Sequence, residues 1–356
     1  MKVLGIETSC DETSVSVVEY LNNTFNLLSN VTATSLDLHA VYGGVVPEIA
    51  ARSHIEHMIP CIEKSLSDSK CTWDDIDAIA VTYGPGLGGS LLVGVCTART
   101  LAHLKNKPLY AINHVQAHSF ATFITQTSLD NYKLPELAPQ FPILSLTVSG
   151  GHTQLVLFKS FFEYQVLGET GDDAIGEAYD KVAKIIGLPY PGGPSIEKFA
   201  PAGNPNAYNF PKSRMENKYD FSFSGIKTAV LRTAQSAIGE DHSFPSKNVA
   251  ERLSEAQKAD IASSFMRVAT ETVVDKTVQA YEEFKPKSVI IAGGVAASRE
   301  LRRQLEERLP IQPIYIDIKL CTDNGAMIAT AGCLMMANNM PTSDPKTLEI
   351  DPNLSM

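Results

Sequence analysis

One short pattern occurs twice in this chain, and it constrains the fold more than any other feature. An apolar run at residues 2–6 is followed by a polar turn and a second apolar run at residues 14–18. Residues 142–148 and 154–158 are apolar runs of the same kind, separated by the polar turn 149–153. Each copy predicts a β-hairpin, and their recurrence indicates a duplicated architecture. A length of 356 residues is enough for two domains.

Helical and strand-like segments alternate around these hairpins, which predicts an α/β fold. A helix is expected at residues 46–66, with an apolar face formed by Ile49, Ile55, Ile59 and Ile62. Further strands are expected at residues 76–82, 288–292 and 314–318, and further helices at 90–104, 248–284, 299–309 and 325–337. The polar, proline-containing residues 127–140 predict a linker between the halves.

A glycine-rich turn at residues 83–89 lies between an expected strand and an expected helix. Such a turn can bind phosphate, because the start of a helix offers free N–H groups. It lacks the Lys-Ser/Thr ending of a P-loop, which argues against an NTPase of that type. The alternative is a tight crossover that uses glycine for its backbone conformation.

Composition limits the class of protein. The hydrophobic fraction of 44% is typical of a soluble globular chain, and the net charge of −10 argues against binding nucleic acid by bulk electrostatics. The six cysteines are scattered without a CxxC pair, as expected for a reducing cytosol. Glu7, Asp11 and Glu12 interrupt the apolar start of the chain too early for a signal peptide, and no apolar run reaches the length of a membrane span. A cytoplasmic location is expected.

A histidine pair suggests a metal site. His114 and His118 are four residues apart, and on a helix both imidazoles point the same way, about 6 Å apart. Asp323 is a candidate third ligand; the alternative is that it only caps the helix that follows. Two imidazoles and one carboxylate leave coordination positions open, which suits a Lewis-acid iron or zinc ion.

Two other interpretations of the histidines can be weighed. A zinc protease needs Glu directly after the first histidine, and Val115 occupies that position, which excludes the protease chemistry. His54 and His57 are three apart and are expected to be histidines on a helix surface rather than ligands.

Three glycine turns predict a ligand cleft in the second half of the chain. They lie at residues 149–151, 191–194 and 293–294, where bare backbone N–H groups can approach a flat ligand or a phosphate. Four acids lie between them: Asp172, Asp173, Glu177 and Asp180. A ribose diol or an adenine amine is a natural partner for such carboxylates, and a solvated acidic helix is the alternative.

Taken together, these motifs resemble the tRNA N6-adenosine threonylcarbamoyltransferase family of the TsaD type. The matching runs lie at residues 5–13, 83–87, 113–118, 148–153, 172–181, 191–194, 293–295 and 321–329. The resemblance implies an actin-like, sugar-kinase-like (ASKHA) fold, a duplicated ribonuclease-H-like α/β architecture with two domains. The expected lobes are residues 1–135, with residues 325–356 packing back on them, and residues 136–324, which would bind the nucleotide moiety.

The resemblance also implies roles for individual residues. His114, His118 and Asp323 would hold one divalent metal ion, Fe2+ or Zn2+, between the halves. Residues expected to bind the substrate are Thr147, Val148, Ser149, Gly150, Gly151, Asp180, Gly193, Glu197 and Ser298. Ser298 stands where the family has Asn, and its shorter side chain bears on adenosine recognition. Asp11 and Glu12 are weak candidates for a general base.

The implied reaction transfers the threonylcarbamoyl group of threonylcarbamoyl-AMP to N6 of adenosine 37 in tRNAs that read codons beginning with A. The implied partners are tRNA, an inactive paralogue of the same fold and a small P-loop ATPase; a homodimer is the other arrangement known in the family. Two alternatives are a small-molecule kinase or ATPase of the same fold, which has no need for the histidine pair, and a non-catalytic assembly subunit, which has no use for an open metal site.

Overall fold

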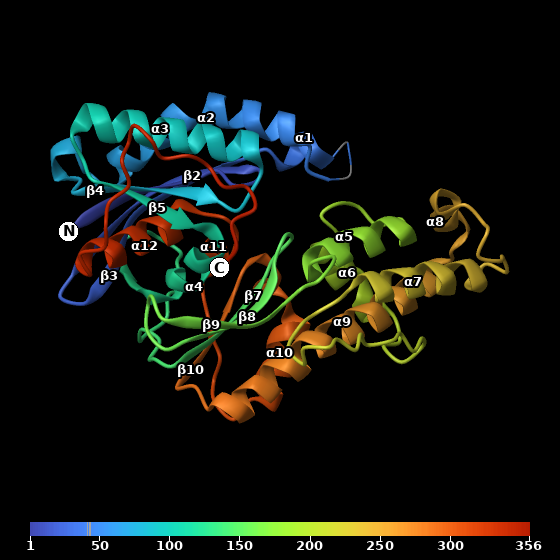
Figure 1. Ribbon diagram of the computed structural model, residues 1–356. Coiled ribbons are helices and arrows are strands. Elements are labelled where there is room, and N and C mark those ends of the chain that lie inside the picture. The colour runs from blue at the N-terminus through green and yellow to red at the C-terminus, as the bar shows by residue number, and fades with distance from the viewer. Residues whose placement is uncertain (41, 43) are drawn as a thin grey trace. The chain divides into compact units, whose positions relative to one another are not determined.

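The computed structural model describes residues 1–40, 42 and 44–356, and its chain divides into two compact units (Figure 1). Unit 1 comprises Met1–Pro139 and Tyr315–Met356, and unit 2 comprises Gln140–Ile314. The second boundary therefore differs from the predicted one, since the chain returns to unit 1 at Tyr315 and not near residue 325. The returning segment is bound to unit 1 because the Asp317 carboxylate accepts a hydrogen bond from the Lys133 backbone N–H.

Unit 1 contains a mixed six-stranded sheet with the order β5-β4-β1-β2-β3-β6. Its strands are β1 (Lys2–Glu7), β2 (Glu12–Leu21), β3 (Thr24–Thr34), β4 (Ala78–Gly84), β5 (Leu109–Asn113) and β6 (Ile124–Thr127). Its helices are α1 (Leu36–Ala40), α2 (Pro47–Asp68), α3 (Gly88–Lys105), α4 (His114–Phe120), α11 (Ile318–Cys321) and α12 (Gly325–Ala337). Strands β1, β4 and β5 run parallel, so their carboxyl ends share one edge of the sheet.

Helix α12 packs directly against β1. Gly5 permits this approach, because a Cβ atom there would lie 2.3 Å from the Gly325 carbonyl oxygen and 2.4 Å from the Ala329 nitrogen. The last helix of the chain is thereby fixed over its first strand, and Asp323 is held just ahead of α12.

The predicted apolar face of α2 is confirmed at Ile62 and wrong at Ile55 and Ile59. Ile55 and Ile59 are 66% and 56% exposed, whereas Ala50, Met58 and Ile62 are buried. The face of α2 that meets the sheet uses small and polar residues as well as apolar ones, including Ser53 and Ser65. The isoleucine pattern therefore placed two exposed side chains, Ile55 and Ile59, on the inner face.

Unit 2 is built around a five-stranded sheet with the order β11-β10-β7-β8-β9. Its strands are β7 (Ile143–Val148), β8 (Thr153–Phe158), β9 (Tyr164–Glu169), β10 (Ser288–Ala292) and β11 (Ile314–Tyr315), the last at the unit boundary. Its helices are α5 (Ile175–Ile186), α6 (Gly192–Phe199), α7 (Ser224–Ala237), α8 (Val249–Arg252), α9 (Glu255–Phe284) and α10 (Arg299–Arg308). Short 3₁₀ helices lie in unit 1 at η1 (Trp73–Asp75) and η2 (Ala121–Phe123), and in unit 2 at η3 (Ala200–Ala202), η4 (Ser246–Asn248) and η5 (Gly294–Ala297).

The two sheets confirm the duplicated hairpins. In unit 1, β1 pairs parallel with β4 and antiparallel with β2, which pairs antiparallel with β3. In unit 2, β7 pairs parallel with β10 and antiparallel with β8, which pairs antiparallel with β9.

The late strand predicted at residues 314–318 is wrong over most of its length. Only Ile314–Tyr315 form a strand, and α11 begins at Ile318. The Asp317 side chain causes this change, because it accepts a hydrogen bond from the Lys319 N–H and so caps α11.

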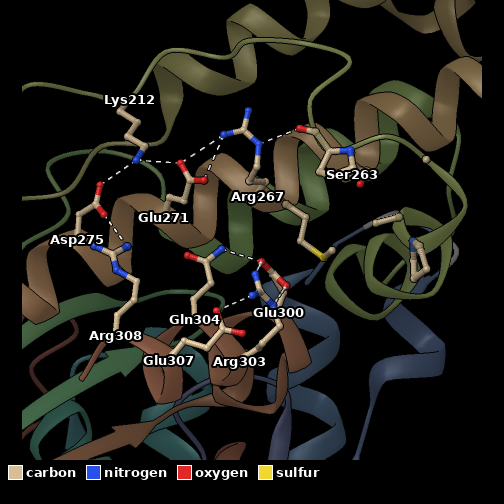
Figure 2. A pocket seen from close by; sticks show the side chains of 15 residues that line it. Lys212, Ser263, Arg267, Glu271, Asp275, Glu300, Arg303, Gln304, Glu307 and Arg308 are labelled. Atoms are coloured by element: carbon tan, nitrogen blue, oxygen red, sulfur yellow. Dashed lines mark hydrogen bonds and ion pairs between the residues drawn. The ribbon is translucent and has the colours of Figure 1, made fainter. Parts of the chain in front are cut away.

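A groove of about 620 Å³ in unit 2 runs along α9 and α10 (Figure 2). Lys212 forms ion pairs with Glu271 and Asp275, and Arg308 pairs with Asp275. Figure 2 shows these side chains pointing toward one another, so that the loop that carries Lys212 is paired with α9, and α10 is paired with α9 through Arg308. The groove is therefore lined by charges that already neutralise each other. No described helix is long and apolar enough to cross a membrane.

Candidate metal centre and ligand loops

The histidine pair lies on α4, which begins where β5 ends. The Asn113 side chain accepts a hydrogen bond from the Gln116 N–H at 3.2 Å and caps this short helix. The imidazoles of His114 and His118, separated by one helical turn, have ring centroids 4.7 Å apart. They are only 4% and 2% exposed. Helical geometry thus brings both rings to one buried point, as the spacing predicted.

Asp323 faces both imidazoles. Its Oδ1 lies 3.4 Å from Nε2 of His114 and 3.3 Å from Nε2 of His118. One ligand atom from each of the three residues lies within 4.8 Å of the others. The alternative that Asp323 caps α12 is wrong, because the neighbouring Asn324 accepts the hydrogen bond from the Met327 N–H.

The donor set fits a divalent metal ion. Within the described part of the chain, Nε2 of His118 is buried and forms no hydrogen bond of acceptable geometry, although Oδ1 of Asp323 lies 3.3 Å away. A buried polar atom without a partner is costly, and a bound cation would satisfy it. Two imidazole nitrogens and one carboxylate oxygen suit zinc or iron and leave coordination positions for a substrate.

Glu7, at the carboxyl end of β1, lies behind His114. Its Oε2 is 3.0 Å from Nδ1 of His114, and its Oε1 accepts a hydrogen bond from the Ser9 N–H. Burial opposes a charge on Glu7, but the facing His114 and the Thr82 hydroxyl lower its pKa below the ordinary value. Burial also opposes a charge on His114, but Asp323 and Glu7 raise its pKa to about 9.

The prediction did not assign Glu7 a role in the site. The expected strands at residues 2–6 and 76–82 were a partial signal, because parallel strands of an α/β sheet end at the same edge, as β1, β4 and β5 do in the structure. Glu7, Thr82 and Asn113 all lie at that edge.

The acids of the first turn lie close to the same cluster. Burial and the neighbouring carboxylates of Asp323 and Asp11 raise the pKa of Glu12 well above the ordinary value. Burial and the same acidic surroundings raise the pKa of the Cys10 thiol, which keeps it protonated.

The expectation for His54 is wrong, because His54 is fully buried. Its Nε2 is 3.0 Å from the Cys10 carbonyl oxygen and its Nδ1 is 2.8 Å from the Thr13 hydroxyl. His54, which belongs to α2, therefore holds the polar turn after β1 in place through these two hydrogen bonds. His57 is half-buried and bonds to Ser53 within its own helix.

The glycine turn at residues 83–89 supports the crossover interpretation rather than the phosphate one. The Gly86 N–H donates to the Pro352 carbonyl and the Leu87 N–H donates to the Ser9 carbonyl. A Cβ atom at Gly84 would lie 2.0 Å from the Asp351 carbonyl oxygen. Glycine is needed here because the C-terminal segment lies directly against the turn.

In unit 2, the predicted ligand loop follows β7. The Ser149 carbonyl accepts a hydrogen bond from the Gly176 N–H at the start of α5. Gly150 and Gly151 are exposed, and a Cβ atom on either would have no neighbour within 4 Å. Gly293 follows the adjacent parallel strand β10 with φ +87°, and its Cα lies against the Val148 carbonyl. Both loops therefore lie at the carboxyl edge of the sheet, where ligands bind in α/β folds.

The remaining predicted substrate residues form a chain of contacts beside this loop. Asp180 accepts a hydrogen bond from the Gly192 N–H at 2.6 Å, and Gly193 has open space where a side chain would be. Glu197 accepts a hydrogen bond from the Arg299 N–H. The neighbouring Ser298 caps α10 by accepting from the Leu301 N–H.

Asp172 and Asp173 are not on a helix and already have partners. Asp172 accepts hydrogen bonds from Ser222 and from the Phe223 N–H, and Asp173 pairs with Lys181 and Lys227. They connect the start of α5 with α7, so that neither a ligand role nor a solvated helix describes these two acids.

Comparisons with known proteins identify the family of this chain. A family model described as "tRNA N6-adenosine threonylcarbamoyltransferase" matches residues 26–330. A protein of that name from Desulfitobacterium hafniense is 46% identical over 336 residues, covering 93% of this chain and 91% of the relative. One from Thermosipho africanus is 44% identical over 360 residues, covering 100% of both chains.

The fold comparison gives the same architecture. Full-length HypF, solved in a phosphate- and nucleotide-bound form, superposes with a TM-score of 0.57 at 12% identity, covering 96% of this chain and 47% of HypF. At that identity the likeness concerns the fold alone. With the duplicated sheets, it places the chain in the actin-like, sugar-kinase-like class.

Proposed function

We propose that this chain, which belongs to the tRNA N6-adenosine threonylcarbamoyltransferase family, holds a catalytic metal ion with His114, His118 and Asp323. It is a transferase that forms threonylcarbamoyladenosine in tRNA, by moving the threonylcarbamoyl group of threonylcarbamoyl-AMP to N6 of adenosine 37 in tRNAs that read codons beginning with A. The acyl carbon–oxygen bond to the phosphate of AMP breaks, a bond to N6 forms, and N6 loses one proton.

The chemistry calls for orientation and charge stabilisation more than for a strong nucleophile. The adenine amine is weak because its lone pair is delocalised, while AMP is a good leaving group. When bound, an iron or zinc ion would polarise the donor carbonyl as a Lewis acid. Asp11 and Glu12 of the first turn are the proposed proton acceptors for the N6 proton.

Unit 2 is proposed to bind the AMP moiety. The exposed N–H groups of Gly150 and Gly151 suit the phosphate, since no side chain blocks them. Asp180 and Glu197, with Gly193 between them in sequence, suit the ribose hydroxyls. Thr147 and Val148 are buried in β7 and hold the loop in place rather than presenting side chains.

Ser298 is proposed to border the adenine. Its hydroxyl already caps α10, which leaves one donor hydrogen for a base at short reach.

Binding of tRNA is proposed to depend on partner proteins. Several basic side chains of unit 2 are neutralised by acids: Lys212 by Glu271 and Asp275, Lys218 by Glu283, and Arg303 by Glu300 and Glu307. The net charge of −10 further disfavours binding of tRNA by this chain alone. The proposed partners are an inactive paralogue of the same fold and a small P-loop ATPase, in the cytoplasm, with a homodimer as the other arrangement.

The convergence of His114, His118 and Asp323 is the observation that carries the proposal. Metal analysis of the purified protein tests it. Wild type is expected to retain about one equivalent of iron or zinc, because catalytic sites of this kind have three protein ligands, and His118→Ala to retain far less. His57→Ala is the control, because this histidine bonds only within α2. Equal metal content in wild type and His118→Ala would remove the metal centre.

A further inference from the structure

We propose that Glu7 is a positioning residue, which orients the His114 imidazole so that its Nε2 faces the metal. This inference rests on the metal centre proposed above and adds a residue that would act through His114 and not contact the metal ion itself. It follows from the contacts of the two ring nitrogens of His114 and of the two oxygens of the Glu7 carboxylate.

The two nitrogens of His114 face different groups. Nε2 is directed to Asp323, at 3.4 Å from its Oδ1, and Nδ1 is directed to Glu7, at 3.0 Å from its Oε2. The Ser9 hydroxyl lies 3.2 Å from the same Nδ1. A carboxylate at Nδ1 favours the tautomer with its proton on Nδ1, which places the lone pair used to bind a cation on Nε2.

Glu7 is itself held rigidly. Its side chain is 0% exposed. The Ser9 N–H donates to Oε1, and the Thr82 hydroxyl donates to Oε2. These donors come from the turn after β1 and from β4, so that two segments of the sheet edge fix the carboxylate. A metal-binding histidine held through a carboxylate in this way gains both orientation and basicity.

A purely structural role for Glu7 predicts different behaviour. A buried carboxylate is costly unless its oxygens are hydrogen-bonded. Here Oε2 of Glu7 faces His114, whose imidazole also lies beside the two other proposed metal ligands, His118 and Asp323. If Glu7 only stabilised the fold, its replacement would lower stability without changing how tightly a metal is bound.

The test measures Zn2+ affinity by competition with a chelating dye, and the absorption spectrum of the Co2+-loaded protein. Glu7→Gln keeps the shape and an acceptor but loses the charge, and is expected to weaken Zn2+ binding by about tenfold. Glu7→Ala is expected to weaken it by up to about a hundredfold and to shift the Co2+ bands. Thr82→Val, which removes one donor to Glu7, is expected to have a smaller effect in the same direction.

Glu300→Gln is the matched control. It neutralises a mostly buried carboxylate in unit 2, which bonds to Arg303 and Gln304, and is expected to leave Zn2+ affinity unchanged. Thermal unfolding of the metal-free proteins identifies variants that do not fold.

The outcomes separate the two proposals. Wild-type affinity and unchanged Co2+ bands in folded Glu7→Gln and Thr82→Val, while His118→Ala loses binding, would overturn the role of Glu7 and leave the metal centre standing. A wild type that binds neither ion, or a His118→Ala variant that binds as wild type, would overturn both.

Discussion

Ser298 has a structural duty that a sequence motif does not reveal. Its hydroxyl accepts a hydrogen bond from the Leu301 N–H and caps α10, while its neighbour Arg299 donates a backbone hydrogen bond to Glu197. The residue therefore stabilises the helix whose first turn adjoins the proposed AMP site.

Replacing Ser298 separates this cap from substrate recognition. Ser298→Ala is expected to lower stability by about 1 kcal/mol, because an N-cap is lost. Ser298→Asn is expected to preserve stability, since Asn caps equally well, and its longer side chain is expected to lower KM for threonylcarbamoyl-AMP. Denaturant unfolding and steady-state kinetics measure the two effects; loss of stability in Ser298→Asn would contradict the capping role.

Asp173 makes a pH-dependent contribution to stability. Its burial raises its pKa, but Lys181 and Lys227 outweigh that effect and lower the pKa below the ordinary carboxyl value. A pKa lower in the folded than in the unfolded state stabilises above the unfolded value of about 4, and this contribution is lost as the pH falls through the folded-state pKa.

Asp173→Asn should therefore destabilise the protein by about 1 kcal/mol at pH 7 and progressively less in acid. Thermal unfolding at a series of pH values between neutrality and pH 3 measures the difference. A gap between wild type and variant that stays constant as the pH falls would show that the ion pairs with Lys181 and Lys227 contribute nothing.

The proximity of the three proposed metal ligands was predictable from the sequence, and the contacts that support them were not. The four-residue spacing fixed the direction of His114 and His118 as soon as they lay on a helix. Asp323 was open to a capping role, and only the contact between Asn324 and the Met327 N–H decides between the two. The role of Glu7 was not predicted, because it depends on three strands that end at one edge of the sheet, and no local sequence pattern shows that arrangement.

Among the elements, α12 packs against a strand without side chains between the two backbones. It begins two residues after Asp323 and lies against β1 where Gly5 and Gly325 allow backbone to meet backbone. Its position over the first strand therefore sets the position of Asp323, the third proposed metal ligand.

Gly5→Ala tests this dependence. The added methyl group overlaps the α12 backbone, so that stability is expected to fall by about 1–3 kcal/mol and Zn2+ affinity to fall with it. Gly225→Ala in α7 is the control, because the new Cβ meets nothing within 4 Å and is expected to be neutral or stabilising. Unfolding and Zn2+ titration are the measurements. A Gly5→Ala variant that binds Zn2+ as wild type would show that α12 does not control Asp323.

Periodicity predicted the strongly apolar elements and failed where polar contacts decide. The expected helix at residues 325–337 is confirmed as α12, and the expected strand at 2–6 is confirmed within β1. The strand at 314–318 was wrong because the Asp317 cap starts a helix there. The α2 face was wrong because its buried side includes Ser53, His54 and Ser65, which periodicity counts as polar.

At the scale of the whole molecule, duplication determines where function can lie. In each unit, the first strand of the hairpin also pairs with a parallel strand: β1 with β4 in unit 1, and β7 with β10 in unit 2. The hairpin turn follows this first strand. The proposed metal ligands belong to unit 1, and the glycine loops proposed to bind AMP lie at the carboxyl edge of the unit 2 sheet. The sequence predicted this repeat, whereas the return of the chain at Tyr315 depends on side-chain contacts of Asp317 that a sequence does not display.

Transfer of labelled threonine from synthetic threonylcarbamoyl-AMP to tRNA, in the presence of the two proposed partner proteins, tests the central claim most directly. Wild type and His57→Ala are expected to place the label on N6 of adenosine 37, and His118→Ala to reduce the rate by about tenfold or more, because it removes one of three metal ligands. Equal transfer by His118→Ala, or no labelled adenosine 37 with wild type, would contradict it.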